Sequence, residues 1–249
     1  MNGFANLLAF GLRRRIKDFF IITYSIGYPL VMILLLGYIS TNFFKGDSSV
    51  TSFQYYTLVL IPFTIFCSII TMAYVAKDES LYKTAYRFII APVSSKSIVL
   101  SKIISCTVVV WLCNMLLLII TKLLLGTHLG ISAGAILFLL LAESLMASAV
   151  GIYLGLAFRN FKTLKGILNI PINIFALLGG VFFPVGALGP TFEKVSYISP
   201  LTWINRGIIA AIYDNNSTIL QYATVITLII GIVFTVLAVT AFKKEAFME

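Results

Sequence analysis

Charged residues are scarce in this sequence of 249 residues. Asp, Glu, Lys and Arg make up 11% of it, against about 25% in typical soluble domains. Hydrophobic residues make up 60%, and the mean hydropathy is +1.03. So few charges cannot solvate the surface of a water-soluble protein, and disorder requires low hydrophobicity with high charge. The composition therefore predicts an integral membrane protein.

Histidine and the glycine motifs that bind phosphate are also lacking. His128 is the only histidine, which excludes the HExxH metal motif and argues against a His-dependent catalytic triad. No GxxxxGK[ST] segment is present, so the sequence has no P-loop for ATP. Cys67, Cys106 and Cys113 lie in apolar runs and are expected to pack as small hydrophobes. We predict no catalytic residue, no metal site and no directly bound cofactor.

Long apolar runs, by contrast, occur six times. A bilayer core about 30 Å thick needs roughly 20 apolar residues per helix. The predicted spans are about 19–39, 55–76, 103–122, 132–158, 166–184 and 218–241. The expected fold class is an all-α membrane protein, with residues 1–249 forming one transmembrane domain of six helices.

The basic residues predict the orientation of these spans. With six spans both termini lie on one side, and that side carries fourteen of the 18 basic residues, whereas the other carries four. The positive-inside rule then places both termini in the cytoplasm of a multi-pass plasma-membrane protein. Topology thus explains the net charge of +9, and no nucleic-acid partner is needed.

Residues 3–18 combine apolar positions at helical spacing with a basic cluster at Arg13–Arg15 and Lys17. Such a segment suits an interfacial helix whose basic face meets anionic lipid. The alternative is an ordinary basic flank that only fixes the orientation.

The inner segment 77–102 is too charged to cross the bilayer and too apolar for a solvated linker. Asp78 and Glu79 are predicted to open a short helix that Pro92 ends. The apolar stretch Phe88–Ala91 requires a cover on the cytoplasmic side. The membrane surface, a groove on another protein and the bundle itself are the three alternatives.

The outer segment 182–214 is rich in glycine, proline and aromatic residues. Pro184, Pro190 and Pro200 each end or kink a helix, so the segment is predicted to form short re-entrant helices at the outer face. Trp203 fits an interfacial aromatic belt.

Polar residues within the spans are few. Glu143 is the sole formal charge there, which suggests either a functional carboxyl group or one that is neutral and bonded to a neighbouring helix. Asn169 and Asn173 are four residues apart and share a helix face. They either join helices or line a path.

In order and spacing these features resemble the type-2 ABC exporter permeases. The family's inner loop has an acidic residue, a short helix, an Ala/Ser-Pro-Val-Ser run and a lysine before the third span. Glu79, Ala91–Ser94 and Lys102 match them here. The family's outer signature is matched by Gly180–Pro184 and Pro200–Thr202. The family often has glycine after the acidic pair, where this sequence has Ser80-Leu81.

The resemblance implies a membrane subunit that works with a second six-span permease, identical or homologous, and with two cytoplasmic ABC ATPase subunits that bind ATP and Mg. It implies that residues 77–102 couple the chain to the ATPase, through Glu79, Tyr82, Arg87, Phe88, Ile89, Ile90, Ala91 and Pro92. The substrate path would include Glu143, Asn169, Asn173 and Phe175. The outer re-entrant gate would include Phe182, Phe183, Pro184, Pro200 and Trp203.

The sparse polar lining favours export of an amphiphilic or hydrophobic substrate, such as a peptide antibiotic, a drug or a lipid-like molecule. The alternative function is a self-sufficient secondary carrier or channel that uses Glu143 as its proton or ion site.

Overall fold

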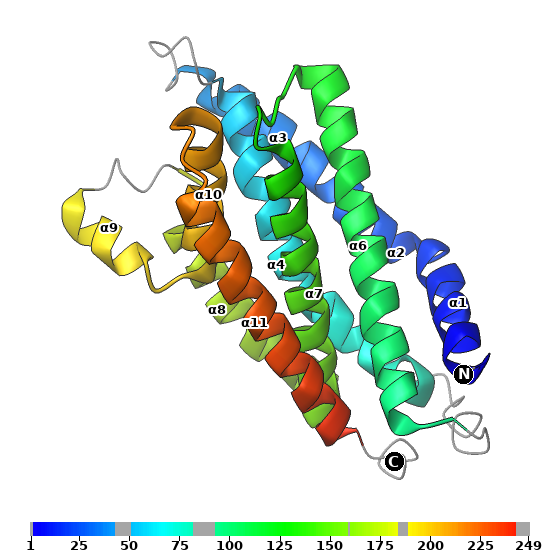
Figure 1. Cartoon of the computed structure of the whole chain (residues 1–249). Coiled ribbons are helices and arrows are strands. Elements are labelled where there is room, and N and C mark those ends of the chain that lie inside the picture. Colours follow the sequence, from blue (N-terminus) through cyan, green and yellow to red (C-terminus); the bar gives the residue numbers. More distant parts are fainter. Residues whose placement is uncertain (1, 43–50, 82–92, 159, 184–188, 243–249) are drawn as a thin grey trace.

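A computed structural model describes residues 2–42, 51–81, 93–158, 160–183 and 189–242, and within these ranges it contains helices and no strand (Figure 1). In chain order the elements are α1 (Asn2–Ile16), α2 (Phe19–Ile22), a π-helical turn (Thr23–Gly27), α3 (Tyr28–Ile39), a 3₁₀ turn (Ser40–Asn42), α4 (Ser52–Leu81), α6 (Ser95–Leu125), α7 (Ala133–Ala157), α8 (Phe161–Leu178), α9 (Pro190–Ser196), α10 (Pro200–Tyr213) and α11 (Thr218–Ala241). The prediction of an all-helical fold holds for the described residues.

Five helical segments are long and apolar enough to cross a membrane. They are Phe19–Ile39, Ser52–Lys77, Ser95–Leu125, Ala133–Ala157 and Thr218–Ala241. These segments correspond to five of the predicted spans, and they fit a multi-pass membrane protein. Predicted span 166–184 falls on α8 and the turn after it, which are not among the five, so the six-span topology stays a prediction.

Helix α4 occupies the middle of the bundle. In its most apolar stretch 89% of the residues are buried, against 28% in α11. Helices α3, α6, α7, α8 and α10 all contact α4, and α11 packs on the far side of α7 (Figure 1). Helix α11 exposes apolar side chains such as Ile229, Ile232 and Val236, as expected of a helix that faces lipid.

Two glycines allow α7 to lie against α4 without a gap. A Cβ atom at Gly151 would meet the backbone carbonyl of Ile69 and lie 2.6 Å from Cβ of Met72. A Cβ atom at Gly155 would meet the backbone carbonyl of Ala73 in the same way. The GxxxG spacing is a known motif for close helix packing in membranes. This close approach was not predicted.

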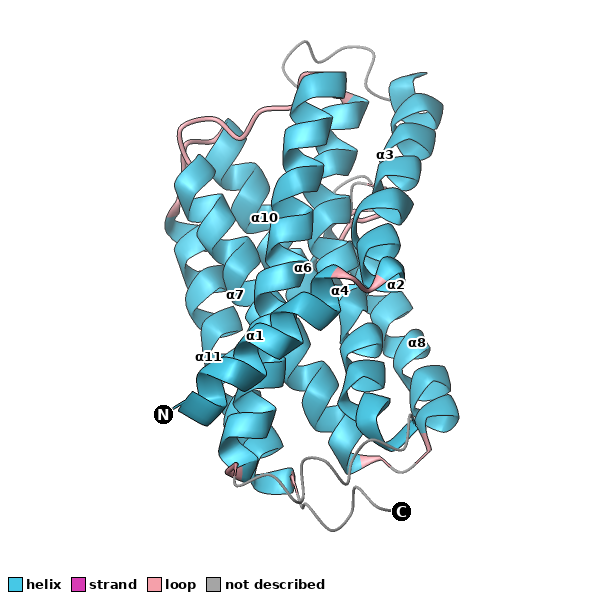
Figure 2. Cartoon of the chain, turned by 90° about the vertical axis from the view of Figure 1, so that its right-hand side faces the viewer, coloured by secondary structure: helices cyan, strands magenta, loops and turns pink. Residues whose placement is uncertain are grey.

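Asp18 separates α1 from α2. Its Oδ1 accepts hydrogen bonds from the backbone N–H groups of Phe20 at 3.1 Å and Ile21 at 3.4 Å. These bonds satisfy donors at the start of α2, as an N-cap does. Helix α1 overlaps nearly all of the predicted interfacial segment 3–18, and it packs across α6 (Figure 2).

The predicted helix start at Asp78 and Glu79 is wrong, because α4 runs through both residues to Leu81. Its 30 residues make a helix about 45 Å long at roughly 1.5 Å per residue, longer than the hydrocarbon core of about 30 Å. The acidic pair therefore belongs to an extension of the second span. Helix α6 likewise begins at Ser95, eight residues before the predicted span.

Candidate functional site

The chain leaves helical geometry directly after α8, at Gly179–Phe182. Two tyrosines in the first turn of α4 bind the backbone of this break. The hydroxyl of Tyr55 donates to the carbonyl oxygen of Gly180 at 2.7 Å, and that of Tyr56 donates to the carbonyl oxygen of Phe182 at 2.9 Å. Helix α4 therefore holds the non-helical segment from one side.

The segment around α10 holds the same break from the other side, through three further side chains that donate to carbonyl groups. The pairs are Asn205 Nδ2 to Gly179 O at 2.7 Å and Ser199 Oγ to Phe175 O at 2.9 Å, and the hydroxyl of Thr202 is shared between Ser196 O at 2.6 Å and Leu178 O at 3.1 Å. An unsatisfied carbonyl in hydrocarbon costs several kcal/mol, so irregular backbone at membrane depth needs such partners. These bonds connect α4, the end of α8 and α10 into one cluster, called the outer cluster after the predicted outer segment 182–214.

Two predicted site residues contribute aromatic rings to this cluster. The ring of Phe175 packs edge-on against Phe66 of α4, with centroids 6.1 Å apart. The ring of Phe182 meets Phe63 of α4 in the same way at 6.2 Å. Phe183 is exposed. The C-terminal end of α8 and the residues after it are therefore fixed to α4 by ring contacts as well as by hydrogen bonds.

A second group of side chains joins α9 to α10. Arg206 Nη2 donates to Glu193 Oε1 at 2.8 Å, and the guanidinium carbon of Arg206 lies 4.5 Å from the ring centroid of Tyr197. Trp203 Nε1 donates to the carbonyl oxygen of Tyr197 at 2.9 Å. Trp203 is one of the predicted site residues, whereas the Glu193–Arg206 ion pair was not predicted, because the two residues are distant in sequence. Pro200 begins α10 at its first turn.

Glu143 lies on α7 and has no exposed surface. Neither carboxyl oxygen accepts a hydrogen bond from the residues that the structure describes. Helix α7, which carries it, packs closely against α4. Glu143 is thus a core residue between two packed helices.

Asn169 and Asn173 are exposed on α8. Each side-chain amide donates to a carbonyl one turn earlier in the same helix: Asn169 Nδ2 to Lys165 O at 2.9 Å and Asn173 Nδ2 to Asn169 O at 2.7 Å. They share a face with the exposed apolar residues Ile170 and Ile174. The predicted path residues therefore have different environments, with the asparagines exposed, Phe175 against α4 and Glu143 in the core.

Several predicted site residues cannot be placed. Tyr82, Arg87, Phe88, Ile89, Ile90, Ala91, Pro92 and Pro184 lie outside the described residues, and Glu79 is described only as part of the α4 backbone. Their proposed roles in ATPase coupling and in the outer gate stay predictions.

Among the described residues no three His, Cys, Asp or Glu side chains gather in a way that could hold a metal ion. No curated protein matches the sequence. A comparison with protein families matches residues 3–213 to the ABC-2 type transporter family, a range that includes the outer cluster and all the helices before α11. The chain therefore belongs to the ABC-2 type transporter family, as a permease component of an ABC transporter.

Proposed function

We propose that the chain is the membrane subunit of an ATP-driven exporter. In this proposal it pairs with a second six-span permease, identical or homologous, and with two separate cytoplasmic ATPase subunits that carry ATP and Mg. The family assignment and the lack of a P-loop in the sequence support it. The energy source then lies on another subunit.

The observation that carries the proposal is the course of α4. At one end its Tyr55 and Tyr56 bind the outer cluster, and at the other it runs without a break to Leu81. The predicted coupling segment 77–102 begins within the last residues of α4 and continues beyond them in the sequence. A long buried helix that joins these two regions is suited to transmit rigid-body motion from an ATPase to the outer closure.

The exposed face of α8 supports an amphiphilic cargo. It combines the apolar side chains Ile170 and Ile174 with the amides Asn169 and Asn173, whose Nδ2 groups already donate to their own helix. A small ion would require several convergent charged or carbonyl ligands. The proposed substrate is therefore an amphiphilic or hydrophobic molecule that enters from the cytoplasm or the inner leaflet.

The arrangement of the helix ends supports a cytoplasmic position for both termini. The start of α1, the end of α11, the last turn of α4 and the first turn of α6 lie at one end of the bundle (Figure 1). That end carries the basic cluster of α1, and Lys96 and Lys102 lie in the first turns of α6. The positive-inside rule assigns such an end to the cytoplasm.

Ile90→Asp tests the proposal, because it introduces a charge into the apolar stretch Phe88–Ala91. We expect the variant to insert normally but to lose co-purification with the ATPase and ATP-dependent export. Ile131→Asp is the matched control, since Ile131 is 98% exposed in the loop between α6 and α7. The control should keep both properties. Normal co-purification and ATP hydrolysis with Ile90→Asp would overturn the coupling assignment.

A further inference from the structure

A polar stripe runs along the exposed face of α8. It consists of Lys162, Lys165, Asn169 and Asn173, all of them exposed. Spacings of three and four residues place side chains one above another on a helix. From Lys162 to Asn173 the stripe covers about 16 Å of helix at roughly 1.5 Å per residue, about half of a hydrocarbon core of about 30 Å. Polar side chains at such a depth face protein or water rather than lipid, so the stripe requires a polar partner.

The stripe starts at the predicted cytoplasmic end of the bundle. Helix α8 follows α7 after a short connection, and Gly155 near the end of α7 lies against Ala73 in the inner half of α4. The backbone after the other end of α8 is bonded to Tyr55 at the start of α4. Helix α8 therefore runs from the inner end toward the outer cluster, at the edge of the bundle (Figure 2). Its lysines lie at the inner end and its asparagines lie deeper.

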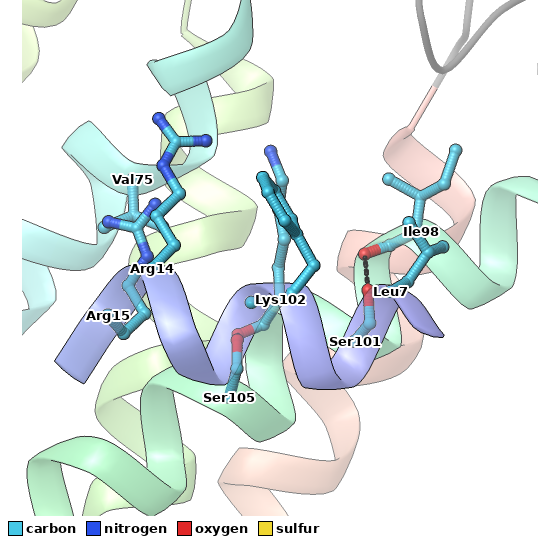
Figure 3. A pocket seen from close by; sticks show the side chains of 10 residues that line it. Leu7, Arg14, Arg15, Val75, Ile98, Ser101, Lys102 and Ser105 are labelled. Atoms are coloured by element: carbon cyan, nitrogen blue, oxygen red, sulfur yellow. Dashed lines mark hydrogen bonds between the residues drawn. The ribbon is translucent and has the colours of Figure 1, made fainter. Parts of the chain in front are cut away.

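The two lysines of the stripe take part in no ion pair within the described part of the chain, where the cations of the ion pairs are Arg15 and Arg206. The basic side chains at the crossing of α1 and α6 differ in this respect (Figure 3). There Arg15 is paired with an aspartate, and Lys102 donates to a backbone carbonyl group. Lys162 and Lys165 are therefore the basic side chains at this end that are best placed to receive an anionic ligand.

The two asparagines of the stripe do not join α8 to another described helix. Asn169 Nδ2 donates to Lys165 O at 2.9 Å, and Asn173 Nδ2 donates to Asn169 O at 2.7 Å. An amide NH₂ group carries two hydrogens, so each side chain keeps one N–H for a ligand. These N–H groups extend the stripe from the lysines toward the middle of the membrane.

Three isoleucines form an apolar surface beside the stripe. Ile167, Ile170 and Ile174 are 54%, 66% and 50% exposed. The exposed side of α8 thus presents cationic and amide donors next to hydrocarbon along the same part of the helix. A ligand that matches both has a negatively charged group attached to a hydrocarbon chain.

Neither bulk lipid nor a second copy of the chain matches this surface as well. Lipid tails would cover the isoleucines but would leave the amides without partners. In a two-fold dimer whose axis is normal to the membrane, the same residues of the two copies lie at the same depth. Direct contact between two stripes would therefore bring lysine against lysine, and like charges repel.

We propose that this polar stripe binds the negatively charged group of the transported amphiphile, first at Lys162 and Lys165 and then at Asn169 and Asn173. The isoleucines contact its hydrocarbon part. The inference rests on the proposed export function, and it narrows the cargo to amphiphiles that carry a carboxylate or a phosphate.

The binding test uses the full-length protein in nanodiscs of phosphatidylcholine, without ATPase or nucleotide. The probes are dansylaminoundecanoic acid, which is an anionic amphiphile, and its amide, which lacks the charge. Binding of each is followed by dansyl fluorescence. Wild type should bind the acid more tightly than the amide. Lys162→Gln/Lys165→Gln should lower the affinity for the acid about tenfold and leave the affinity for the amide unchanged.

The matched control is Arg13→Gln/Lys17→Gln, which removes the same charge from exposed positions of α1 at the same end of the bundle. It should bind the acid like wild type. Lys162→Arg/Lys165→Arg keeps the charges and should keep the preference for the acid. A loss of binding that this variant restores is therefore due to charge rather than to misfolding.

The asparagines are tested by transport in liposomes that contain the complete complex. Asn169→Leu/Asn173→Leu should lose most of the ATP-driven uptake of the acid. Its thermal unfolding temperature should equal that of wild type, because neither amide bonds to another described helix. Unchanged uptake with a higher unfolding temperature would assign this face of α8 to lipid. Loss of the permease dimer in the variant, measured by cross-linking, would assign the face to a second copy.

Equal loss of acid binding in the lysine and control variants would also overturn the proposal, because it would show a diffuse attraction to the basic end of the bundle. Failure of the export function would give a different result. The acid would still bind through the two lysines of α8, but the ATPase and ATP would produce no uptake in liposomes.

Discussion

Glu143 is fully buried, and its carboxyl oxygens lack hydrogen-bond partners among the described residues. An ionised carboxylate in such surroundings is strongly disfavoured. A transporter driven by a separate ATPase requires no charge at this position, whereas a proton or ion carrier would require the carboxyl group itself. A substitution of Glu143 can therefore distinguish the ATP-driven exporter from the self-sufficient carrier or channel.

We predict that Glu143→Gln retains ATP-dependent export and unfolds at the same or a higher temperature, because a neutral amide of similar size replaces the acid. Export is measured in vesicles and stability in detergent. A variant that folds and binds the ATPase normally but no longer transports would contradict the exporter mechanism and favour the carrier.

Gly151 lies so close to α4 that no larger side chain fits there. Gly151→Ala would place a methyl group against the backbone of Ile69 and the side chain of Met72. We expect a loss of about 1–3 kcal/mol of stability, typical of overpacking, measured by thermal or denaturant unfolding. Gly134→Ala on the same helix meets nothing within 4 Å and should be neutral or stabilising by up to about 1 kcal/mol. Similar unfolding curves for the two variants would contradict close packing of α4 and α7.

Single residues differ in how far the sequence predicts them. Glu143 stands out as the sole charge in its apolar run, and Gly151 and Gly155 have a recognisable spacing. Their packing partners on α4 could not be derived from sequence, because they depend on which helices become neighbours. For the same reason the sequence grouped Asn169 with Phe175, although one is exposed and the other packs on α4.

Helices α4 and α10 hold the non-helical backbone that follows α8. Side-chain hydroxyl and amide groups from both helices satisfy carbonyl groups of 175–182. This arrangement lets non-helical backbone exist beside an apolar core. A movement of α4 would therefore move the backbone after α8 as well, because the two are directly bonded.

Removing the two tyrosine hydroxyls tests this link. We predict that Tyr55→Phe/Tyr56→Phe lowers stability by about 1 kcal/mol per lost hydrogen bond, and that it speeds hydrogen exchange of the backbone amides at 179–183. Tyr222→Phe removes a hydroxyl from a side chain that is 64% exposed on α11, and it should change neither quantity. Unchanged exchange at 179–183 in the double variant would show that α4 does not hold the break.

Helix existence and type followed from the apolar runs, but helix ends did not. Asp78 and Glu79 have the composition of a helix start, yet α4 continues through them because nothing in that stretch breaks a helix before Leu81. The boundary at Asp18 was predicted, between the interfacial segment 3–18 and the span from residue 19, but its physical cause was not. A single capping carboxylate ends one helix and starts the next without any glycine or proline.

On the scale of the whole molecule, the chain is a bundle around one buried helix that runs from the outer cluster to the predicted coupling segment. The family assignment covers α1 to α10 and agrees with the resemblance drawn from the inner and outer motifs. The Glu193–Arg206 pair was not predicted. It joins residues from two different helices, and sequence spacing does not encode that arrangement.

The proposed exporter depends on a separate ATPase for its energy. The most direct measurement places purified chain in liposomes, alone or with its ATPase, and follows uptake of a fluorescent amphiphile that the complete complex accumulates. We predict uphill accumulation only when the ATPase, ATP and Mg are all present, and its loss with Ile90→Asp. Uphill accumulation by the chain alone, without nucleotide, would contradict the account.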